Sequence, residues 1–449
     1  MIARWFDPAR SRELLLLAGP IVLGMSSQII LNLVDTAMVG RVGHQAQAAA
    51  GLGGFAFWML ANLLLGLGTG VQTMCSRRHG EDRPDAAGAV LDISLVLCFV
   101  VALPMGWLLA QTAGLIFNAA TSDPVIAEEG TTYLAIRMMG LGAVVANYCY
   151  RGFYNGVGRP LVYMSSLALI QVVNIFLNWV FIFGNLGSRA MGVEGAALAS
   201  VLAAVFGVVF YSIVTVVFSD IRRVFRPLRF RNLLSVGPRR LIQISWPDSL
   251  RGVLVMTAFF VFLELHEGLG SREAAAGAVL VNIASAGYLV ALGFGLACAT
   301  LVGRNLGKGE PIEARRMVWL GVRMAGTVLL LPALILGLFA PAILGVFTLD
   351  QLVVEVATSA LRLFALAAIV DVLPIVLVYS LLGAGATRWV AGVQVGQQYL
   401  VMLPLAWLLA YPLGLGVLGL WMAMVISRAL LAVLAVPKFQ GRSWESIEV

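Results

Sequence analysis

A single acid interrupts the first long apolar run of the chain. Asp35 is the only ionisable residue between residues 14 and 39. An ionised carboxylate at membrane depth costs at least about 2.5 kcal/mol, so such a residue usually faces a cavity and has a function. A structural alternative stays open, in which Asp35 reaches the outer surface or caps a neighbouring helix. Because aspartate reaches poorly compared with lysine or arginine, we favour a functional acid that could bind a cation or a proton.

Two asparagines form the next candidate group. Asn174 and Asn178 lie four residues apart in the apolar run 160–184, and residues with this spacing project from one face of a helix. Their carbonyl oxygens could ligate a sodium ion, and their amides could hydrogen-bond to a protonated acid. A purely structural hydrogen bond between neighbouring helices explains them equally well.

A second acid, Asp371, is expected deep in the run 361–384. It follows Arg362 by nine residues, which corresponds to a rise of about 13 Å along a helix. Pro374 lies beside it and loosens the helix. The structural alternative is an ion pair with an arginine of a neighbouring helix, because Arg362 is too far along the same helix to serve. We expect a second site for a cation or a proton here.

One pair of opposite charges lies near the beginning of the run 240–265. Asp248 and Arg251 are three residues apart, a spacing that brings side chains together on a helix surface. We expect a structural ion pair, with a role as an inner gate as the alternative.

The sequence contains none of three enzyme motifs: CxxC, HExxH or a nucleophile elbow. The four cysteines have no CxxC spacing, so we expect neither a disulfide framework nor a metal centre. There is also no HExxH sequence and no nucleophile elbow. The sequence therefore predicts a protein that is not an enzyme and needs no cofactor, with a sodium ion at Asp35 or Asp371 as the one metal to consider.

The elements that must hold these residues are membrane helices. Hydrophobic residues make up 60% of the 449 residues, and charged residues only 12%. A hydrocarbon core requires about 20 apolar residues per helix, and no run alternates with the period of two that a barrel strand needs. The sequence predicts an all-α integral membrane protein with twelve transmembrane helices, over 14–39, 48–75, 88–112, 130–153, 160–184, 192–217, 240–265, 275–301, 317–340, 361–384, 389–413 and 416–438.

Basic residues indicate how these helices are oriented. Most of the 30 lysines and arginines share one side if the chain crosses an even number of times. Since this is the positive-inside pattern, we expect both termini in the cytoplasm, in the plasma (inner) membrane of a prokaryote. The net charge of +7 then requires no nucleic-acid partner. The cytoplasmic set includes the cluster 222–240, Arg304 and Arg428, and the opposite set is Arg41, Arg137, Arg189, Arg272 and Arg362.

The second half of the chain repeats the first with an offset of 227 residues. Pro20 corresponds to Pro247, and "LGLGTGVQTMCSRRHGEDRP" at 65–84 corresponds to "LGFGLACATLVGRNLGKGEP" at 292–311. Because each half holds six expected helices, an even number, both halves enter the membrane in the same direction. In transporters with such parallel repeats, the substrate pathway lies between the repeats.

The repeat predicts two six-helix lobes around a central cleft. We expect the N-lobe over 1–218, a basic cytoplasmic linker over 219–240, and the C-lobe over 241–449. The linker is rich in arginine and contains Pro227 and Pro238. Its charge is better explained by contact with anionic lipid than by a nucleic acid.

Five motifs together resemble the multidrug and toxic compound extrusion (MATE) family. They are "VDTAMVG" from residue 34, "GLGTGVQTMCSRRHGE" from residue 66, "FYNGVGRP" from residue 153, "NIFLNWVFIFG" from residue 174 and "MGVEGAALAS" from residue 191. The resemblance covers nearly the whole chain. It implies export of cationic, amphipathic compounds in exchange for sodium ions or protons, by alternating access between the lobes, in a protein expected to work as a monomer among membrane lipids.

The resemblance also bears on the candidate residues. Asp35 coincides with the family's acid on the first helix, and Asn174 matches an asparagine near that acid in one branch. Asn178 stands where some members of that branch have a second aspartate. Asp371 resembles an aspartate of another branch, whose glutamate midway along the seventh helix is missing from the comparable segment here. Each branch's ion site is therefore incomplete in this sequence.

Two alternatives come from other classes of function. A flippase for lipid-linked oligosaccharides could share the two-lobe plan, and it is the alternative we keep. Its anionic cargo would require several arginines within the membrane runs, where we expect only Arg251 to serve. A membrane-embedded enzyme has no supporting motif, and the soluble segments are too short to form a catalytic domain.

Overall fold

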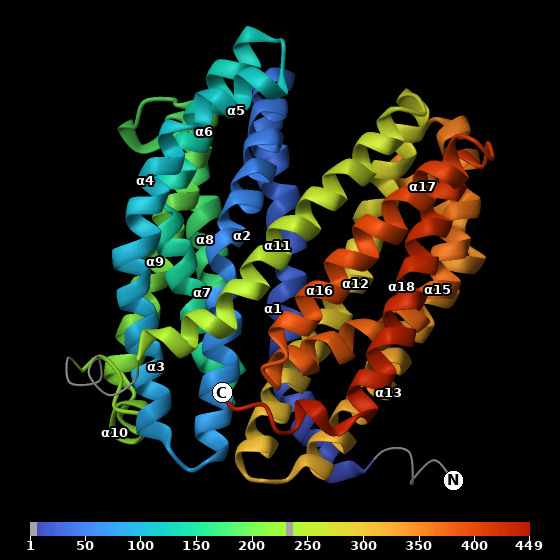
Figure 1. The fold of residues 1–449 in the computed structure, drawn as a ribbon. Coiled ribbons are helices and arrows are strands. Elements are labelled where there is room, and N and C mark those ends of the chain that lie inside the picture. The colour runs from blue at the N-terminus through green and yellow to red at the C-terminus, as the bar shows by residue number, and fades with distance from the viewer. Residues whose placement is uncertain (1–6, 230–236) are drawn as a thin grey trace. The chain divides into compact units, whose positions relative to one another are not determined.

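Helices account for all the regular structure in the described part of the chain. The computed structural model describes residues 7–229 and 237–449 (Figure 1), and the prediction of an all-α protein is confirmed for these ranges. The helices are α1 (Pro8–Gly40), α2 (His44–Gly80), α3 (Pro84–Leu97), α4 (Leu103–Gln111), α5 (Ala113–Ala120), α6 (Pro124–Met139), α7 (Leu141–Gly156), α8 (Pro160–Phe183), α9 (Gly192–Val217), α10 (Ser219–Val224), α11 (Pro238–Glu267), α12 (Ser271–Gly307), α13 (Pro311–Leu338), α14 (Ala340–Phe347), α15 (Gln351–Gly383), α16 (Thr387–Gln397), α17 (Leu403–Ala410) and α18 (Gly416–Gln440).

Eleven segments in the described ranges are long and apolar enough to cross a membrane. The expected run 130–153 is not among them, because it is divided at Gly140 into α6 and α7, each of 16 residues. At the break, the N–H of Gly140 donates to the carbonyl of Arg137 at 3.1 Å, only three residues back. A Cβ at Gly140 would lie 2.6 Å from a methyl group of Val201 on α9. The expectation of one continuous helix was wrong here, because a tight turn and a close neighbour interrupt it.

Two other expected helices contain a π-helical turn. The turns cover Cys98–Ala102 between α3 and α4, and Gln398–Met402 between α16 and α17. In each case the next residues are Leu-Pro, with the prolines at 104 and 404. Proline has no N–H to donate and its ring crowds the carbonyl four residues earlier. A π turn just before the proline accommodates that crowding without ending the helix.

The packing divides the chain into two compact units. One unit is Leu23–Ser249, and the other combines Met1–Val22 with Leu250–Val449. The division therefore falls within α1 and within α11, at positions that are equivalent under the 227-residue repeat. The packing units differ from the lobes expected from the repeat in two places: the part of α1 before Leu23 belongs to the unit of the second half, and the part of α11 before Leu250 belongs to the unit of the first half. The expected lobe boundaries therefore remain a prediction.

Equivalent glycines explain how the N-terminal parts of α1 and α11 pack within their units. In the Leu23–Ser249 unit, a Cβ at Gly66 of α2 would lie 2.5 Å from the main chain of Ser245 and Ser249 on α11. In the other unit, a Cβ at Gly293 of α12 would lie 2.4 Å from a methyl group of Val22 on α1. Gly66 and Gly293 correspond in the repeat, so each repeat uses the same glycine to admit a neighbouring helix at backbone distance.

Ion pairs hold the beginning of α1 within its unit. Arg10 forms a two-pronged ion pair with Glu313 of α13, and one of its contacts, from Nη2 to Oε2, measures 3.0 Å. Arg304 of α12 pairs with Glu13 in addition. A forked arginine contact fixes the relative position of both groups as well as compensating their charge.

Replacing Gly66 with alanine is expected to destabilise the protein. The added methyl group would overlap main-chain atoms that cannot move aside, and overpacking of this kind costs about 1–3 kcal/mol. The measurement is the apparent melting temperature of the purified protein in detergent. Gly326→Ala in α13 is the matched control, because a Cβ there would meet nothing within 4 Å. Equal melting temperatures for the two variants would contradict the close packing at Gly66.

The segment after α10 is fastened to α3 by a buried acid. Asp92 is 5% exposed, and its two carboxylate oxygens accept hydrogen bonds from the main-chain N–H groups of Leu228 at 2.6 Å and Arg229 at 3.1 Å. Phe225 is buried as well, and a Cβ at Gly88 would lie 1.9 Å from its carbonyl oxygen. The beginning of the expected linker is therefore part of the Leu23–Ser249 unit up to Arg229.

Removing this carboxylate should expose the segment to proteolysis. In Asp92→Ala, the N–H groups of Leu228 and Arg229 lose their acceptors, so we expect trypsin to cut after Arg229 at least about fivefold faster, the effect of losing a bond to a charged group. The control is Asp85→Ala, which removes an exposed acid from the first turn of the same helix. Unchanged cleavage in Asp92→Ala would show that other contacts hold the segment.

Candidate functional site

The two asparagines are placed by the way α8 begins and ends. Pro160 occupies the first turn of the helix, where its missing N–H is not needed. Gly184 ends the helix in a left-handed conformation with φ of 75°, which glycine adopts without strain. Asn174 and Asn178 lie between these ends, and both side chains are buried. As predicted from their spacing, they share one face of the helix.

A chain of hydrogen bonds links Asp35 to the asparagines. Asn178 donates from Nδ2 to Oδ1 of Asp35 at 2.7 Å and to Oδ1 of Asn174 at 3.2 Å. Asn174 donates in turn to Oγ of Ser200 on α9 at 3.4 Å, and Ser200 donates to the carbonyl of Ala196 at 3.0 Å. The structure therefore brings together three helices and three of the four residues predicted as coupling groups. Ser200 is a further member that the sequence did not single out.

One hydrogen-bond acceptor among these site residues has no donor in the described part of the chain. The Oδ1 atom of Asn178 is buried and has no hydrogen-bond partner among residues 7–229 and 237–449. A buried amide oxygen without a partner is costly, and it can accept a proton donor or ligate a cation. It lies on the same amide group that already contacts Asp35, so the two groups can act on one ligand.

These residues line a cavity of about 640 Å³ within the Leu23–Ser249 unit. Asp35 and Arg137 are the only charged residues among those that line it. Seven amide side chains line it as well, and Trp58, Tyr133 and Tyr148 provide aromatic surface. A volume of this size is typical of small-molecule sites. The amides that line the cavity are Gln28, Asn32, Gln47, Asn147, Gln171, Asn174 and Asn178.

An apolar cluster adjoins the polar site on the same helices. Val39 on α1 and Ile182 on α8 each follow a site residue by one helical turn, and both are buried in a cluster with Tyr133 and Val193. Asp35 and Asn178 therefore lie one helical turn from this apolar cluster.

Arg137 is a site residue that the sequence analysis assigned only to the outer surface. Its helix, α6, is capped by Asp123, which accepts hydrogen bonds from the N–H groups of Val125 and Ile126. A further hydrogen bond from Gln45 lowers the pKa of Asp123. Arg137 lies near the other end of α6, with its guanidinium 4.1 Å from the ring centroid of Phe57. Because Arg137 lies inside the expected run 130–153, the sequence already indicated that it could face the interior of the helix bundle.

The second acid has the partner that the sequence analysis could not identify. Asp371 on α15 lies 3.8 Å from Nε of Arg428 on α18, an ion pair beyond hydrogen-bonding distance. Arg428 lies twelve residues after the first residue of α18, in the interior of a helix apolar enough to span a membrane. Its assignment to the cytoplasmic side stays a prediction, and the packing of α15 against α18 shows that Asp371 compensates its charge.

Comparison with known proteins places the chain in a family. A family model described as MatE matches residues 20–180 and matches again at 247–408, and together these ranges exceed half of the chain. The chain belongs to the MATE family of transporters. The two matches begin 227 residues apart, which is the offset of the internal repeat, so each half of this MATE transporter matches the model once.

Relatives and solved structures agree with this assignment. This MATE transporter is 27% identical to the multidrug resistance protein NorM of Burkholderia vietnamiensis, with 94% of this chain and 92% of that protein covered. The probable multidrug resistance protein NorM of Caulobacter vibrioides is also 27% identical, with 96% and 92% covered.

Among solved structures, a MOP superfamily transporter from Pyrococcus furiosus matches with a TM-score of 0.88 and 22% identity, covering 96% of this chain and 95% of that one. A crystal structure of MATE in the bent conformation gives a TM-score of 0.87 at 22% identity, with 97% and 95% covered. These structures confirm the predicted twelve-helix membrane fold.

The remaining predicted pair lies on α11 of this MATE transporter. Asp248 is 6% exposed. Arg251 donates from Nη1 to Oε1 of Gln394 on α16 at 2.8 Å. The pairing of Asp248 with Arg251, and a role for it as a gate, stay predictions.

Proposed function

We propose that this MATE transporter exports cationic, amphipathic compounds across the inner membrane of a prokaryote in exchange for sodium ions or protons, with Asp35 as the coupling residue. The hydrogen-bond chain from Asp35 to Ser200, whose residues line a cavity of about 640 Å³, carries the proposal. Export of drugs is supported by the relatives, which are named as multidrug resistance proteins, and the cationic, amphipathic class of cargo rests on the resemblance to the family.

The amide of Asn178 suits either state of Asp35. When the carboxylate is ionised, Nδ2 donates to it, as observed at 2.7 Å. When a proton is bound, rotation of the amide presents Oδ1, which is otherwise without a partner in the described ranges, to accept from the carboxylic acid. A sodium ion would use the carboxylate oxygen and the same Oδ1. In each case the site gains one positive charge, and rotation of the amide gives up the hydrogen bond from Nδ2 to Asn174.

Coupling follows from a difference in affinity. An ion that binds more tightly to one conformation than to the other shifts the equilibrium between them. A carboxylate supplies this difference because its desolvation changes as the cavity opens to one side of the membrane or the other. Neutralising Asp35 from outside would then favour release of the cationic cargo.

We place the coupling site in the Leu23–Ser249 unit rather than at Asp371. The guanidinium of Arg428 lies 3.8 Å from that acid and already supplies its positive counter-charge. An external cation at Asp371 would meet electrostatic repulsion from Arg428. Asp371 and Arg428 are therefore proposed as a structural pair.

A flippase for anionic, lipid-linked cargo is less well supported. Such a cargo needs an excess of positive charge where it binds. Arg137 is the only basic residue that lines the cavity, and Asp35 offsets its charge.

The test is dye efflux from reconstituted vesicles, driven separately by a sodium gradient and by a pH gradient. The proteins are the unmodified chain, Asp35→Asn and Asp371→Asn. Transport under either gradient that is lost in Asp35→Asn and kept in Asp371→Asn would support the proposal. Loss in Asp371→Asn alone would place the coupling site at that acid, and no dye movement under either gradient would favour the flippase.

A further inference from the structure

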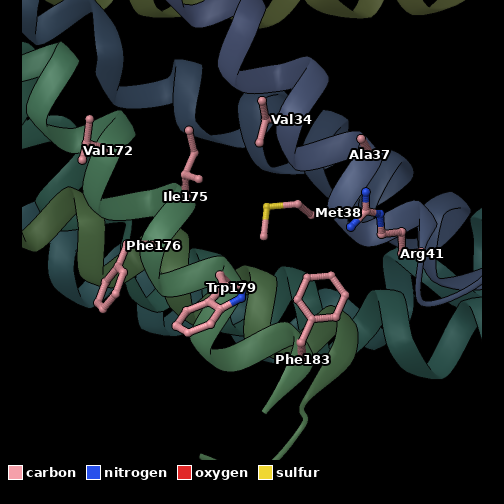
Figure 2. A pocket seen from close by; sticks show the side chains of 9 residues that line it. All are labelled: Val34, Ala37, Met38, Arg41, Val172, Ile175, Phe176, Trp179 and Phe183. Atoms are coloured by element: carbon pink, nitrogen blue, oxygen red, sulfur yellow. The ribbon is translucent and has the colours of Figure 1, made fainter. Parts of the chain in front are cut away.

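The two helices that carry the polar site each have a second, apolar face. Val34, Ala37 and Met38 on α1, and Arg41 directly after it, recur at intervals of three and four residues, and none of them lines the Asp35 cavity. On α8 the corresponding set is Val172, Ile175, Phe176, Trp179 and Phe183. Figure 2 shows Ile175, Trp179 and Phe183 across from Val34 and Met38. The two sets form a groove, which we call the α1–α8 groove.

This groove is open and its walls are large apolar side chains. Its volume is about 620 Å³. Val172, Phe176 and Trp179 are 64%, 51% and 43% exposed, and the rings of Phe176 and Trp179 lie 6.2 Å apart. In a membrane protein, exposed apolar surface of this kind contacts lipid chains. A shaped groove differs from a smooth surface because it surrounds a chain on more than one side and gains more contact with it.

Arg41 gives the groove an electrostatic preference. It directly follows the last residue of α1 and is the only charged residue that lines the groove. In Figure 2 it lies beside Met38. Its side chain is exposed and has no ion-pair partner in the part of the chain that the structure describes. A cation at the end of an apolar groove complements an amphiphile that has an anionic head and a hydrocarbon tail.

We propose that the α1–α8 groove binds one anionic phospholipid, with its phosphate on Arg41 and an acyl chain between Met38 and Trp179. The binding has a consequence for the polar site. Asp35 lies next to Val34 on α1, and Asn178 lies next to Trp179 on α8, so the 2.7 Å hydrogen bond between them joins the same two helices that form the groove. A lipid that packs against both helices stabilises the arrangement in which this bond is made.

Photo-crosslinking in vesicles tests the proposal. The purified protein is reconstituted in phosphatidylcholine with a small fraction of a phospholipid that has a diazirine in its acyl chain. The photoreactive lipid is either phosphatidylglycerol, which is anionic, or phosphatidylcholine, which is neutral overall. Adducts on peptides 34–41 and 172–183 are quantified by mass spectrometry. We expect about fivefold more adduct with the anionic lipid, the effect of one basic residue on anionic lipid binding.

Matched variants distinguish a site from the surrounding lipid. Arg41→Gln should remove the preference for the anionic lipid, whereas Arg189→Gln, which changes another exposed arginine just after α8, should keep it. Ala37→Phe fills the groove and should lower the adduct from both lipids at least about threefold. If Arg41→Gln does not yield folded protein, the Ala37→Phe result decides.

Equal labelling by the two lipids in the unmodified protein would overturn the proposal, since it would show only bulk lipid in contact with α1 and α8. An unchanged preference in Arg41→Gln, or unchanged labelling in Ala37→Phe, would overturn it as well. None of these measurements involves drug transport, so the outcome is independent of whether the proposed export function holds.

Discussion

Asp35→Asn reduces gradient-driven export of a cationic dye to the level of protein-free vesicles. Asparagine keeps the shape of aspartate and can still hydrogen-bond with Asn178, so the protein is expected to fold and to reach the membrane. It carries no charge and takes up no proton at any working pH, so the ion has nothing to neutralise. The loss of transport should appear under both a sodium gradient and a pH gradient. Dye efflux from reconstituted vesicles, with the amount of protein measured in each preparation, is the readout.

Asp82→Asn is the matched control for this experiment. Asp82 is exposed in the turn after α2, with a positive φ of 59°, a conformation that asparagine tolerates well. The control makes the same chemical change outside any cavity and should transport at the unmodified rate. Drug resistance at the unmodified level in cells that express Asp35→Asn would show that another group couples transport.

Arg428→Met is expected to cost about 3 kcal/mol or more of stability. The substitution leaves the carboxylate of Asp371, whose side chain is 19% exposed, without a counter-charge in a helix long and apolar enough to span a membrane. An uncompensated charge at membrane depth costs about 3 kcal/mol. The measurement is the apparent melting temperature in detergent at neutral pH. Because Asp371 is the cause of the loss, the double variant Arg428→Met/Asp371→Asn should recover most of it.

The double variant distinguishes the loss of charge compensation at Asp371 from a loss of packing at Arg428. A loss that persists in the double variant would mean that Arg428 acts through packing and not through Asp371. A normal melting temperature for Arg428→Met alone would mean that Asp371 is not ionised beside it. Under the proposed function, the double variant should also keep ion-driven dye efflux, since the coupling acid is Asp35.

Much of the fold follows from local properties of the sequence. A helix that spans the hydrocarbon core must be long, apolar and internally hydrogen-bonded, and each of these requirements is met or missed within about 20 consecutive residues. Eleven of the predicted runs correspond to candidate spans, and the repeat at 227 residues corresponds to the two matches of the family model. The run 130–153 differs because its break depends on Gly140 and on Val201, a residue about 60 positions away.

The sequence by itself determined which residues carry charge or amide groups inside apolar helices, and so identified Asp35, Asn174, Asn178 and Asp371. Only the tertiary structure decided which of them act together. Asp35 and Asn178 are 143 residues apart in the chain and 2.7 Å apart in space. Arg428, expected at a membrane surface, is the partner of Asp371. Hydropathy and helical spacing act along one segment, whereas a hydrogen bond or an ion pair depends on which helix packs alongside, and packing is decided by shape across the whole unit.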